Sequence, residues 1–226
     1  MFLIGDVHGR DDLLVELLDR YPHHAKHLVF LGDLVDRGEE SAQVLTRVKA
    51  LTDRTTNIIC LRGNHEEMLL EFLRTPQETG PRWLASGGLQ TLASFGVGGL
   101  SAHSKGPALE AAAEALAVAM GPDLQTWIET RPTFWQSGSL VAVHAAADPG
   151  LPMTAQDDET RLWGHPGFFA APRRDGLWVA HGHTVTDAPT CAHSRISLDT
   201  GAWYTGRLTG ALVEPDGNVE FVSSGA

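Results

Sequence analysis

The sequence of 226 residues is long enough for one domain with a substantial core, and 42% hydrophobic and 20% charged residues are typical of a globular protein. The formal net charge of −11 argues against non-specific binding to nucleic acid or to an anionic membrane surface. Two cysteines, Cys60 and Cys191, form no CxxC pair and support neither a thiolate zinc site nor a disulfide framework. The first apolar run reaches Asp6 at once, too short for a signal-peptide core, and no run approaches the ~20 residues of a membrane span. We therefore expect a cytoplasmic protein.

Three similar units follow one another in the first third of the chain. Residues 2–4, 28–31 and 58–61 are short apolar runs that predict strands, and a polar loop and then a helical pattern follow each run. The spacing of Asp6, Asp33 and Asn64 is close to the ~30 residues of a βαβ unit. Because right-handed crossovers place such strand ends at one edge of a sheet, we expect these loops to converge.

The middle of the chain has a different character. Residues 83–92 contain a Gly-Gly pair and predict a loop between short helices, and residues 96–106 are rich in Gly and Ser. An alanine-rich helix is predicted over 108–120 and a shorter one over 122–130. We interpret residues 74–131 as a helical insertion within a single domain that spans residues 1–226.

Strand signals return in the second half. Residues 140–143 end in His144, and residues 177–180 end in a segment that contains His181 and His183. Further strand signals cover 195–198, 210–213 and 219–222. Both halves thus place polar side chains at strand ends. This pattern predicts an α/β fold in which two mixed β-sheets face each other in a sandwich flanked by helices.

Five strand-end clusters carry the candidate chemistry. They are Asp6/His8, Asp33/Asp36/Arg37, Arg62/Asn64/His65, His144 and His181/His183. Each cluster alone has an ordinary explanation, since Gly-Asp pairs make turns and a lone histidine is often a structural residue. Together they offer nitrogen and oxygen ligands that suit divalent Mn, Fe or Zn. One shared carboxylate would hold two such ions ~3.5–4 Å apart, as two-metal hydrolysis requires.

The motifs GDxHG, GDxVDRG and GNHE, a strand-end histidine and a late Gly-His pair occur here in this order. This set resembles the calcineurin-like metallophosphoesterases and, within them, the phosphoprotein phosphatase family, especially its small bacterial and phage lambda-type protein phosphatases. The resemblance extends to residues 83–88 and 199–201, so it covers nearly the whole chain.

The resemblance implies roles for individual residues. Two divalent ions, most simply Mn²⁺ with Fe or Zn as alternatives, would be held by the following ligands: Asp6 and His8 for the first, Asn64, His144 and His183 for the second, and Asp33 as the bridge. His65 would be the general acid, oriented by Asp36, while Arg37 and Arg62 would hold the phosphate. His183 is preferred over His181 because the family segment is a Gly-His pair.

One position departs from the family pattern. Related phosphatases carry Trp-x-Arg after the His144 strand, whereas this chain has His165 where the arginine is expected. His165 would then be the substrate-binding residue there, although Arg161, Arg173 or Arg174 is an alternative clamp. Five further histidines match no motif and are expected at the surface: His23, His24, His27, His103 and His193.

The resemblance implies a metal-dependent phosphomonoester hydrolase, foremost a Ser/Thr (and also Tyr) protein phosphatase in which a metal-activated hydroxide attacks phosphorus. The alternative is a dinucleoside polyphosphate hydrolase, which uses the same motifs, and a phosphodiesterase comes third. A phosphoprotein or a small phosphorylated molecule would be the substrate. A metal-binding but inactive regulatory module is the rival from another class. The chain has neither a Gly-x-Ser-x-Gly elbow nor a P-loop motif.

Overall fold

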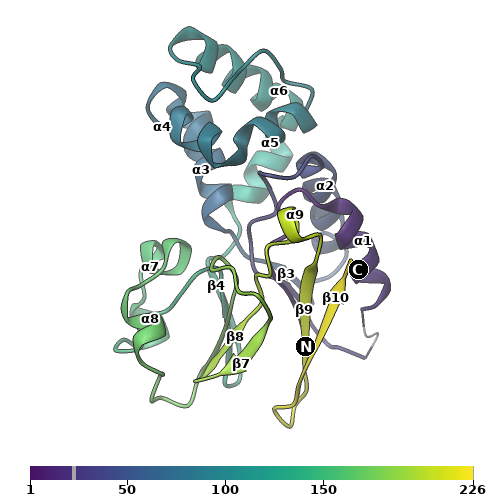
Figure 1. Cartoon of the computed structure of the whole chain (residues 1–226), viewed down its shortest axis with the longest axis vertical. Coiled ribbons are helices and arrows are strands. Elements are labelled where there is room, and N and C mark those ends of the chain that lie inside the picture. Colours follow the sequence, from purple (N-terminus) through teal and green to yellow (C-terminus); the bar gives the residue numbers. More distant parts are fainter. Residues whose placement is uncertain (22–23, 226) are drawn as a thin grey trace.

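The computed structural model describes residues 1–21 and 24–225, so the expectation for His23 lies outside the described residues. Two five-stranded sheets form its centre (Figure 1). In the first sheet the strands are ordered β10 (Val219–Ser224), β9 (Leu208–Val213), β1 (Phe2–Ile4), β2 (Leu28–Phe30) and β3 (Ile58–Cys60). In the second they are ordered β4 (Phe134–Ser137), β5 (Leu140–Val143), β6 (Trp178–His181), β8 (Arg195–Ser197) and β7 (Thr190–Ala192). The predicted pair of mixed sheets is confirmed.

The parallel strands of the first sheet are apolar on both faces. β1, β2 and β3 pair in parallel, whereas β9 is antiparallel to β1. Phe2 and Ile4 belong to the core beneath the helices, while Leu3 between them belongs to the layer shared with the second sheet. This alternation follows from the period of two in a strand, and burial on both faces explains the unbroken apolar runs.

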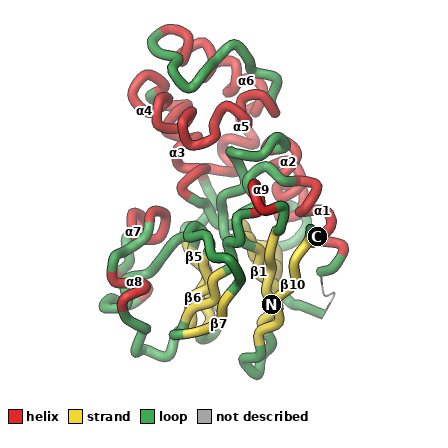
Figure 2. The backbone as a smooth tube through the Cα atoms, viewed as in Figure 1, coloured by secondary structure: helices red, strands yellow, loops and turns green. Residues whose placement is uncertain are grey.

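Helices cover the outer faces of both sheets (Figure 2). α1 (Asp11–Asp19) and α2 (Ser41–Thr52) contact the first sheet, and α3 (Asn64–Arg74) begins directly after β3. Outside the second sheet lie a 3₁₀ turn (Met153–Ala155), α7 (Asp158–Trp163) and α8 (Gly167–Ala170). Phe168 of α8 packs with Val141 and Val179 of that sheet. Each sheet is therefore closed on its outer side by its own helical layer.

A helical segment stands beside α3 at one end of the molecule (Figure 1). It comprises α4 (Pro76–Trp83), a π-helical turn (Leu84–Gly88), α5 (Leu89–Ser94) and α6 (Pro107–Glu129). The predicted loop over 83–92 is wrong, because the chain stays helical there apart from a break at Gly87, whose φ is 113°. A second break, at Gly121 with φ 70°, separates the two helices predicted in α6. That this segment is an insertion into one domain of 1–226 is a proposal.

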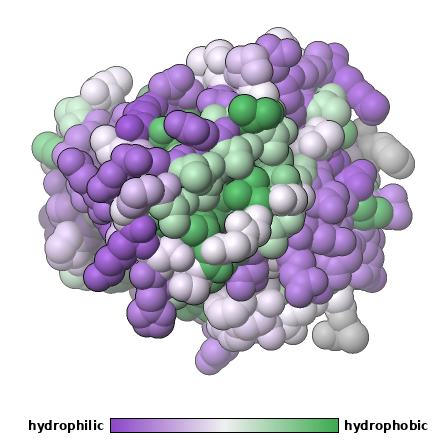
Figure 3. All heavy atoms as spheres, turned by 90° about the horizontal axis from the view of Figure 1, so that it is seen from above, coloured by the Kyte–Doolittle hydropathy of each residue, from purple (hydrophilic) through white to green (hydrophobic). Residues whose placement is uncertain are grey.

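The surface of the helical segment carries an apolar area surrounded by polar side chains (Figure 3). Val118 in α6 is 83% exposed. No helix in residues 1–21 and 24–225 is long and apolar enough to cross a membrane. His24, His103 and His193 are exposed and His27 is half-buried, while the Cys60 thiol is buried in the core.

Candidate active site

The loops that follow β1, β2, β3, β5 and β6 meet at one edge of the two sheets, as the spacing of the motifs predicts. Seven non-glycine residues in the described chain have a positive φ, and five of them belong to these loops: His8, Asp33, Asp36, Arg37 and His183. A positive φ at a non-glycine residue costs about 1–3 kcal/mol of conformational free energy. It persists only where the surrounding structure holds it, typically at functional sites. The concentration of left-handed residues marks this edge as the site.

Glu66 fixes two of these loops to each other. Its buried carboxylate accepts hydrogen bonds from the backbone N–H groups of Gly63 (2.8 Å), Asp33 (2.8 Å) and Leu34 (2.7 Å). Gly63 is required because a Cβ atom there would lie 2.2 Å from Asp33 Oδ1. Motif matching found Glu66 only as part of GNHE and gave it no role. The structure shows that it holds the Asp33 loop at the start of α3.

Two histidines point their Nε2 atoms at Asp33. His8 donates from Nδ1 to the Val35 carbonyl (2.7 Å) and His144 from Nδ1 to the Leu31 carbonyl (3.0 Å). A carbonyl only accepts, so these bonds place a proton on Nδ1 of each ring, and in the neutral ring Nε2 then has a lone pair that can bind a metal ion. His8 Nε2 is buried without a hydrogen-bond partner in the described chain and lies 3.5 Å from Asp33 Oδ2. His144 Nε2 lies 3.3 Å from Asp33 Oδ1.

The remaining predicted ligands close the cluster. Asn64 Oδ1 lies 2.8 Å from His144 Nε2 and 2.9 Å from His183 Nδ1. Asp6 accepts a hydrogen bond from the His183 backbone N–H (3.0 Å), and a Cβ atom on Gly182 would touch the Asp6 carboxylate. Two groups of residues each bring their ligand atoms within 4.8 Å of one another, and Asp33 belongs to both groups. The first group is His8, Asp33 and His65, and the second is Asp33, His144 and His183. This shared carboxylate is the arrangement expected of a bridge.

Burial and charge in the cluster call for cations. Burial and the neighbouring Asp199 raise the pKa of Asp6 well above its ordinary value. Burial also opposes ionisation of Asp33, but His144 and His65 outweigh it and lower that pKa. Burial alone would lower the pKa of His144, yet Asp33 and Asp6 raise it to about 10. Buried carboxylates beside histidine ring nitrogens, of which His8 Nε2 has no hydrogen-bond partner among the described residues, fit divalent ions held by nitrogen and oxygen. Ions there would lower the pKa of a water molecule and neutralise phosphoryl oxygens.

His65 and Asp36 form a buried pair beside the cluster. His65 Nδ1 donates to Asp36 Oδ2 at 2.7 Å. Burial alone would lower the pKa of His65, but Asp33 and Asp36 overcome that effect and raise it. Arg37 Nη2 donates to His65 Nε2 at 3.0 Å, because a guanidinium has no acceptor atom, so Nε2 accepts in this arrangement.

The helical segment holds Asp36 in place. Asp36 is fully buried and accepts hydrogen bonds from Trp83 Nε1 (2.9 Å) and Thr91 Oγ1 (2.6 Å). The Gly87 carbonyl accepts a hydrogen bond from the Arg37 backbone N–H at 3.2 Å. No sequence pattern pointed to Thr91, and Trp83 was singled out only through the family resemblance. Residues 74–131 therefore do more than pack, because they orient the carboxylate that orients His65.

Trp83→Phe tests this positioning role. It removes the N–H donor to Asp36 but keeps an aromatic ring against Phe72, whose centroid lies 4.6 Å from that of Trp83. We expect kcat to fall roughly tenfold to a hundredfold, as for other groups that orient a site residue, while the bound metal stays unchanged. Trp127→Phe is the matched control, because its Nε1 donates to Thr52 (3.0 Å) within another part of the fold. Equal kcat values for the two variants would contradict the role.

Two of the predicted phosphate-binding residues do not contact the cluster. The Arg62 guanidinium lies 3.2 Å from Glu67 and donates to the Glu129 carbonyl (2.9 Å). His165 Nε2 lies 3.7 Å from Asp148 Oδ2, and its Nδ1 accepts from the Gly167 N–H. In both cases a nearby acceptor or carboxylate holds the side chain. Their roles toward phosphate stay predictions, and only Arg37 among the predicted clamps contacts a site residue.

The alternative clamps are also engaged elsewhere or exposed. Arg161 donates to Asp158, Thr133 and the Met153 carbonyl. Arg173 donates to Asp175 and to two backbone carbonyls, while Arg174 is exposed.

His181 is buried outside the cluster. It pairs with Ser197 Oγ (2.8 Å) and packs against the Phe168 ring, with centroids 5.0 Å apart. Burial lowers its pKa to about 4. This environment suits a structural histidine rather than a ligand.

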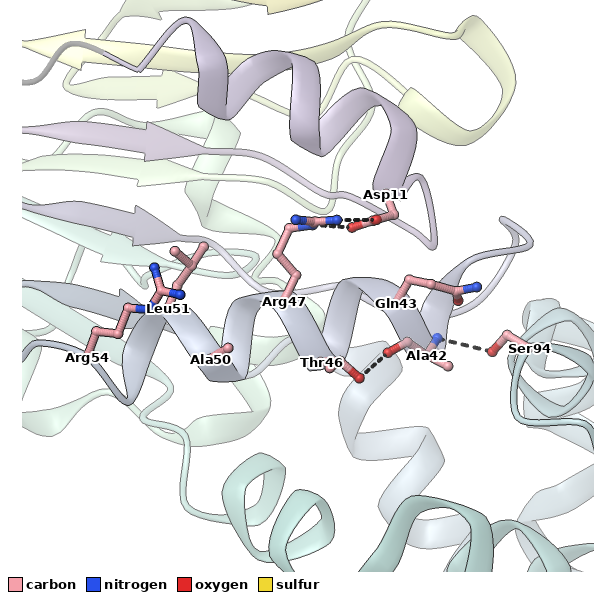
Figure 4. A pocket seen from close by; sticks show the side chains of 9 residues that line it. All are labelled: Asp11, Ala42, Gln43, Thr46, Arg47, Ala50, Leu51, Arg54 and Ser94. Carbon is pink, nitrogen blue, oxygen red and sulfur yellow. Dashed lines mark hydrogen bonds and ion pairs between the residues drawn. The ribbon is translucent and has the colours of Figure 1, made fainter.

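A separate groove of about 550 Å³ runs along α2 (Figure 4). In this groove Arg47 forms a bidentate ion pair with Asp11, at 2.7 and 2.8 Å. At one end of the groove, Ser94 Oγ accepts a hydrogen bond from the Ala42 backbone N–H. None of the residues that line it belongs to the predicted site. We therefore assign no role in the reaction to this groove.

Two mixed sheets, with a carboxylate shared by two candidate metal groups in the loops at their edge, are the arrangement expected of a metallophosphoesterase. The family model of the calcineurin-like phosphoesterases matches residues 2–187. The chain belongs to this family, as its motifs predict.

Individual relatives differ in the substrate that their names give. The chain is 28% identical to an asymmetrical bis(5′-nucleosyl)-tetraphosphatase of Halalkalibacterium halodurans, over 98% of this chain and 92% of that protein. It is 34% identical to serine/threonine-protein phosphatase 1 of Salmonella typhimurium, but over only 39% of this chain and 38% of that protein. A solved structure of a candidate diadenosine tetraphosphatase superposes with a TM-score of 0.66 at 21% identity, covering 99% of this chain and 93% of that one. At that identity the superposition shows the fold alone.

Proposed function

We propose that this chain is a metal-dependent hydrolase of dinucleoside polyphosphates that cleaves a phosphoanhydride bond. The observation that carries the proposal is the extent of the likeness to the asymmetrical tetraphosphatase, which reaches 98% of this chain. The likeness to the Salmonella protein phosphatase stops at 39%. This favours the alternative reading of the sequence over its main reading as a protein phosphatase.

The site residues fit this reaction. Asp6, His8, Asp33, Asn64, His144 and His183 would hold two divalent ions, with Mn²⁺ the first to test. Arg37 would bind a phosphoryl oxygen through its guanidinium, which is suited to phosphate. His65, oriented by Asp36, would protonate the leaving oxygen. A phosphoanhydride leaving group is a phosphate that is stable as an anion, so this reaction needs less protonation than the release of an alcohol.

A protein phosphatase is the second candidate, and the buried His65–Asp36 pair is the observation that favours it. The two side chains are 2.7 Å apart, and Asp33 and Asp36 raise the pKa of His65 against the effect of burial. A histidine that donates a proton is of most use when the leaving group is a poor one, such as the alkoxide of serine or threonine.

A side-by-side rate comparison tests the proposal. Protein reconstituted with Mn²⁺ is assayed on diadenosine tetraphosphate and on phosphoserine, phosphothreonine and phosphotyrosine peptides. We expect kcat/KM for the dinucleotide to exceed that for each peptide by at least about tenfold, a difference of ~1.4 kcal/mol in transition-state binding. Asymmetrical cleavage would release AMP and ATP, whereas symmetrical cleavage would release two ADP. A higher kcat/KM on any of the peptides would overturn the proposal in favour of the second candidate.

A further inference from the structure

The short helix α9 (Ala202–Thr205) carries two neighbouring exposed aromatic side chains. Trp203 is 42% exposed and Tyr204 57% exposed, and their ring centroids are 5.0 Å apart at an interplanar angle of 66°. Of this helix only Ala202 joins the hydrophobic core. Single exposed aromatic residues are ordinary, but an adjacent pair whose burial contributes little to the fold suggests a binding role.

The pair is held in place by the backbone around it. Gly201 has a φ of 69°, and a Cβ atom there would lie 2.3 Å from the Tyr204 ring. The glycine thus allows the ring to lie against the main chain. Arg10 Nη1 donates to the Ala202 carbonyl (3.0 Å), which ties α9 to the loop that follows β1. The backbone that carries the two rings therefore forms a fixed platform, so little backbone entropy would be lost when a ligand binds.

The platform adjoins the phosphate-binding side of the site. The Arg37 Cζ atom lies 5.6 Å from the centroid of the Trp203 ring, and Arg37 Nη2 lies 3.0 Å from His65 Nε2. His65 Nε2 in turn lies 3.9 Å from Asp33 Oδ2. The side chain of Arg37 therefore lies between the aromatic pair and the buried pair of His65 and Asp36. Figure 1 shows α9 at the end of β9, on the side of the sheets where the helical segment stands.

We propose that Trp203 and Tyr204 form a stacking subsite for a nucleobase of the substrate, an inference that rests on the proposed function. A nucleotide joins its base to its phosphates through one ribose, so its recognition calls for an aromatic face next to a phosphate-binding group. Stacking on aromatic side chains accepts every base. It also supplies binding that does not depend on charge, which matters because a net charge of −11 repels a polyphosphate at long range.

Competitive inhibition by a nucleotide and by its base-free counterpart tests the subsite. ATP and inorganic tripolyphosphate are compared as inhibitors of p-nitrophenyl phosphate hydrolysis with Mn²⁺, after KM has been measured for each variant. For Trp203→Ala we expect the inhibition constant of ATP to rise roughly tenfold, in line with the loss of one base–aromatic stack, while that of tripolyphosphate changes less than about twofold. Tyr204→Ala should change the constants in the same sense, and Trp203→Phe should retain most of the ATP affinity.

Trp178→Leu is the matched control, because Trp178 is also exposed, at 37%, but begins β6 at the opposite end of the strand from the site loops. It should change neither inhibition constant. An equal rise of both constants in Trp203→Ala would mean that Trp203 only positions Arg37 and would overturn the subsite, as would no change in the ATP constant. The wild-type protein alone decides the proposed function, because failure to cleave diadenosine tetraphosphate would refute that function whatever the inhibition constants show.

Discussion

Asp33→Asn is expected to lower kcat by roughly a thousandfold or more, because it weakens the one carboxylate that lies in both groups of candidate metal ligands. The Asp33 oxygens lie 3.5 Å from His8 Nε2 and 3.3 Å from His144 Nε2. An amide of the same shape offers one oxygen instead of two and carries no charge. Its Oδ1 can still accept the hydrogen bond from the His65 backbone N–H, which measures 3.0 Å. We therefore expect the fold to survive while both ions are lost.

Metal analysis and thermal unfolding measure this outcome without relying on activity. Ions that bind only the folded state stabilise it, so Mn²⁺ should raise the Tm of the wild-type protein but hardly that of Asp33→Asn. Asp11→Asn is a suitable control, because Asp11 pairs with Arg47 outside the cluster and its loss should leave metal binding intact. The bridging role is refuted if Asp33→Asn keeps two ions per chain, or if the wild-type protein binds at most one.

Most strands that the sequence predicts are buried on both faces, although the predicted edge strands β3 and β10 have mostly half-buried side chains. Residues 2–4 and 28–30 are fully apolar because each alternate side chain meets either the helices or the second sheet. β4 and β7 were not predicted, and both are edge strands with exposed or half-buried side chains. The turn between β7 and β8 also gave no hairpin signal. Two residues with positive φ usually are Asn-Gly in such a turn, but here they are His193 and Ser194.

The candidate ligands could be predicted because each directly follows a strand, and parallel strands end at one edge. The groups that orient them could not. Trp83 and Thr91 reach Asp36 from helices 47 and 55 positions away, in a segment whose pattern shows only packing. Such contacts depend on how a helical segment docks, which no periodicity encodes. The same holds for α9, because the sequence does not show that its adjacent Trp-Tyr pair lies next to Arg37.

Arg62 and His165 illustrate the opposite limit of motif matching. A motif places a residue type at a strand end but does not fix where a long or rotatable side chain points. Here Arg62 lies close to Glu67 and donates to the Glu129 carbonyl, and His165 accepts from the Gly167 N–H, so both side chains are engaged by local partners. The short side chains of Asp33 and Asn64 have no such freedom, and the structure brings both to the predicted place.

His65→Asn is expected to lower kcat by roughly 10²–10⁴ on alkyl phosphates and by much less on diadenosine tetraphosphate. The difference follows from the leaving group, because an alkoxide must be protonated as it departs whereas a nucleotide phosphate is stable as an anion. The structure gives His65 the geometry of an acid, with Nδ1 bonded to Asp36 at 2.7 Å and Nε2 facing the cluster. Asp33 and Asp36 raise the pKa of His65 against the effect of burial.

The rival role for His65 is that of a metal ligand, since its ring lies within the group formed with His8 and Asp33. The two roles give different results in the same variant. Loss of an acid leaves the metal content unchanged and makes kcat more sensitive to the leaving group, whereas loss of a ligand removes metal and lowers kcat on both substrates alike. Asp36→Asn should reproduce the first pattern more weakly, because Trp83 and Thr91 would still hold the side chain that orients His65. Metal loss with an equal drop on both substrates would therefore move His65 from proton donor to ligand.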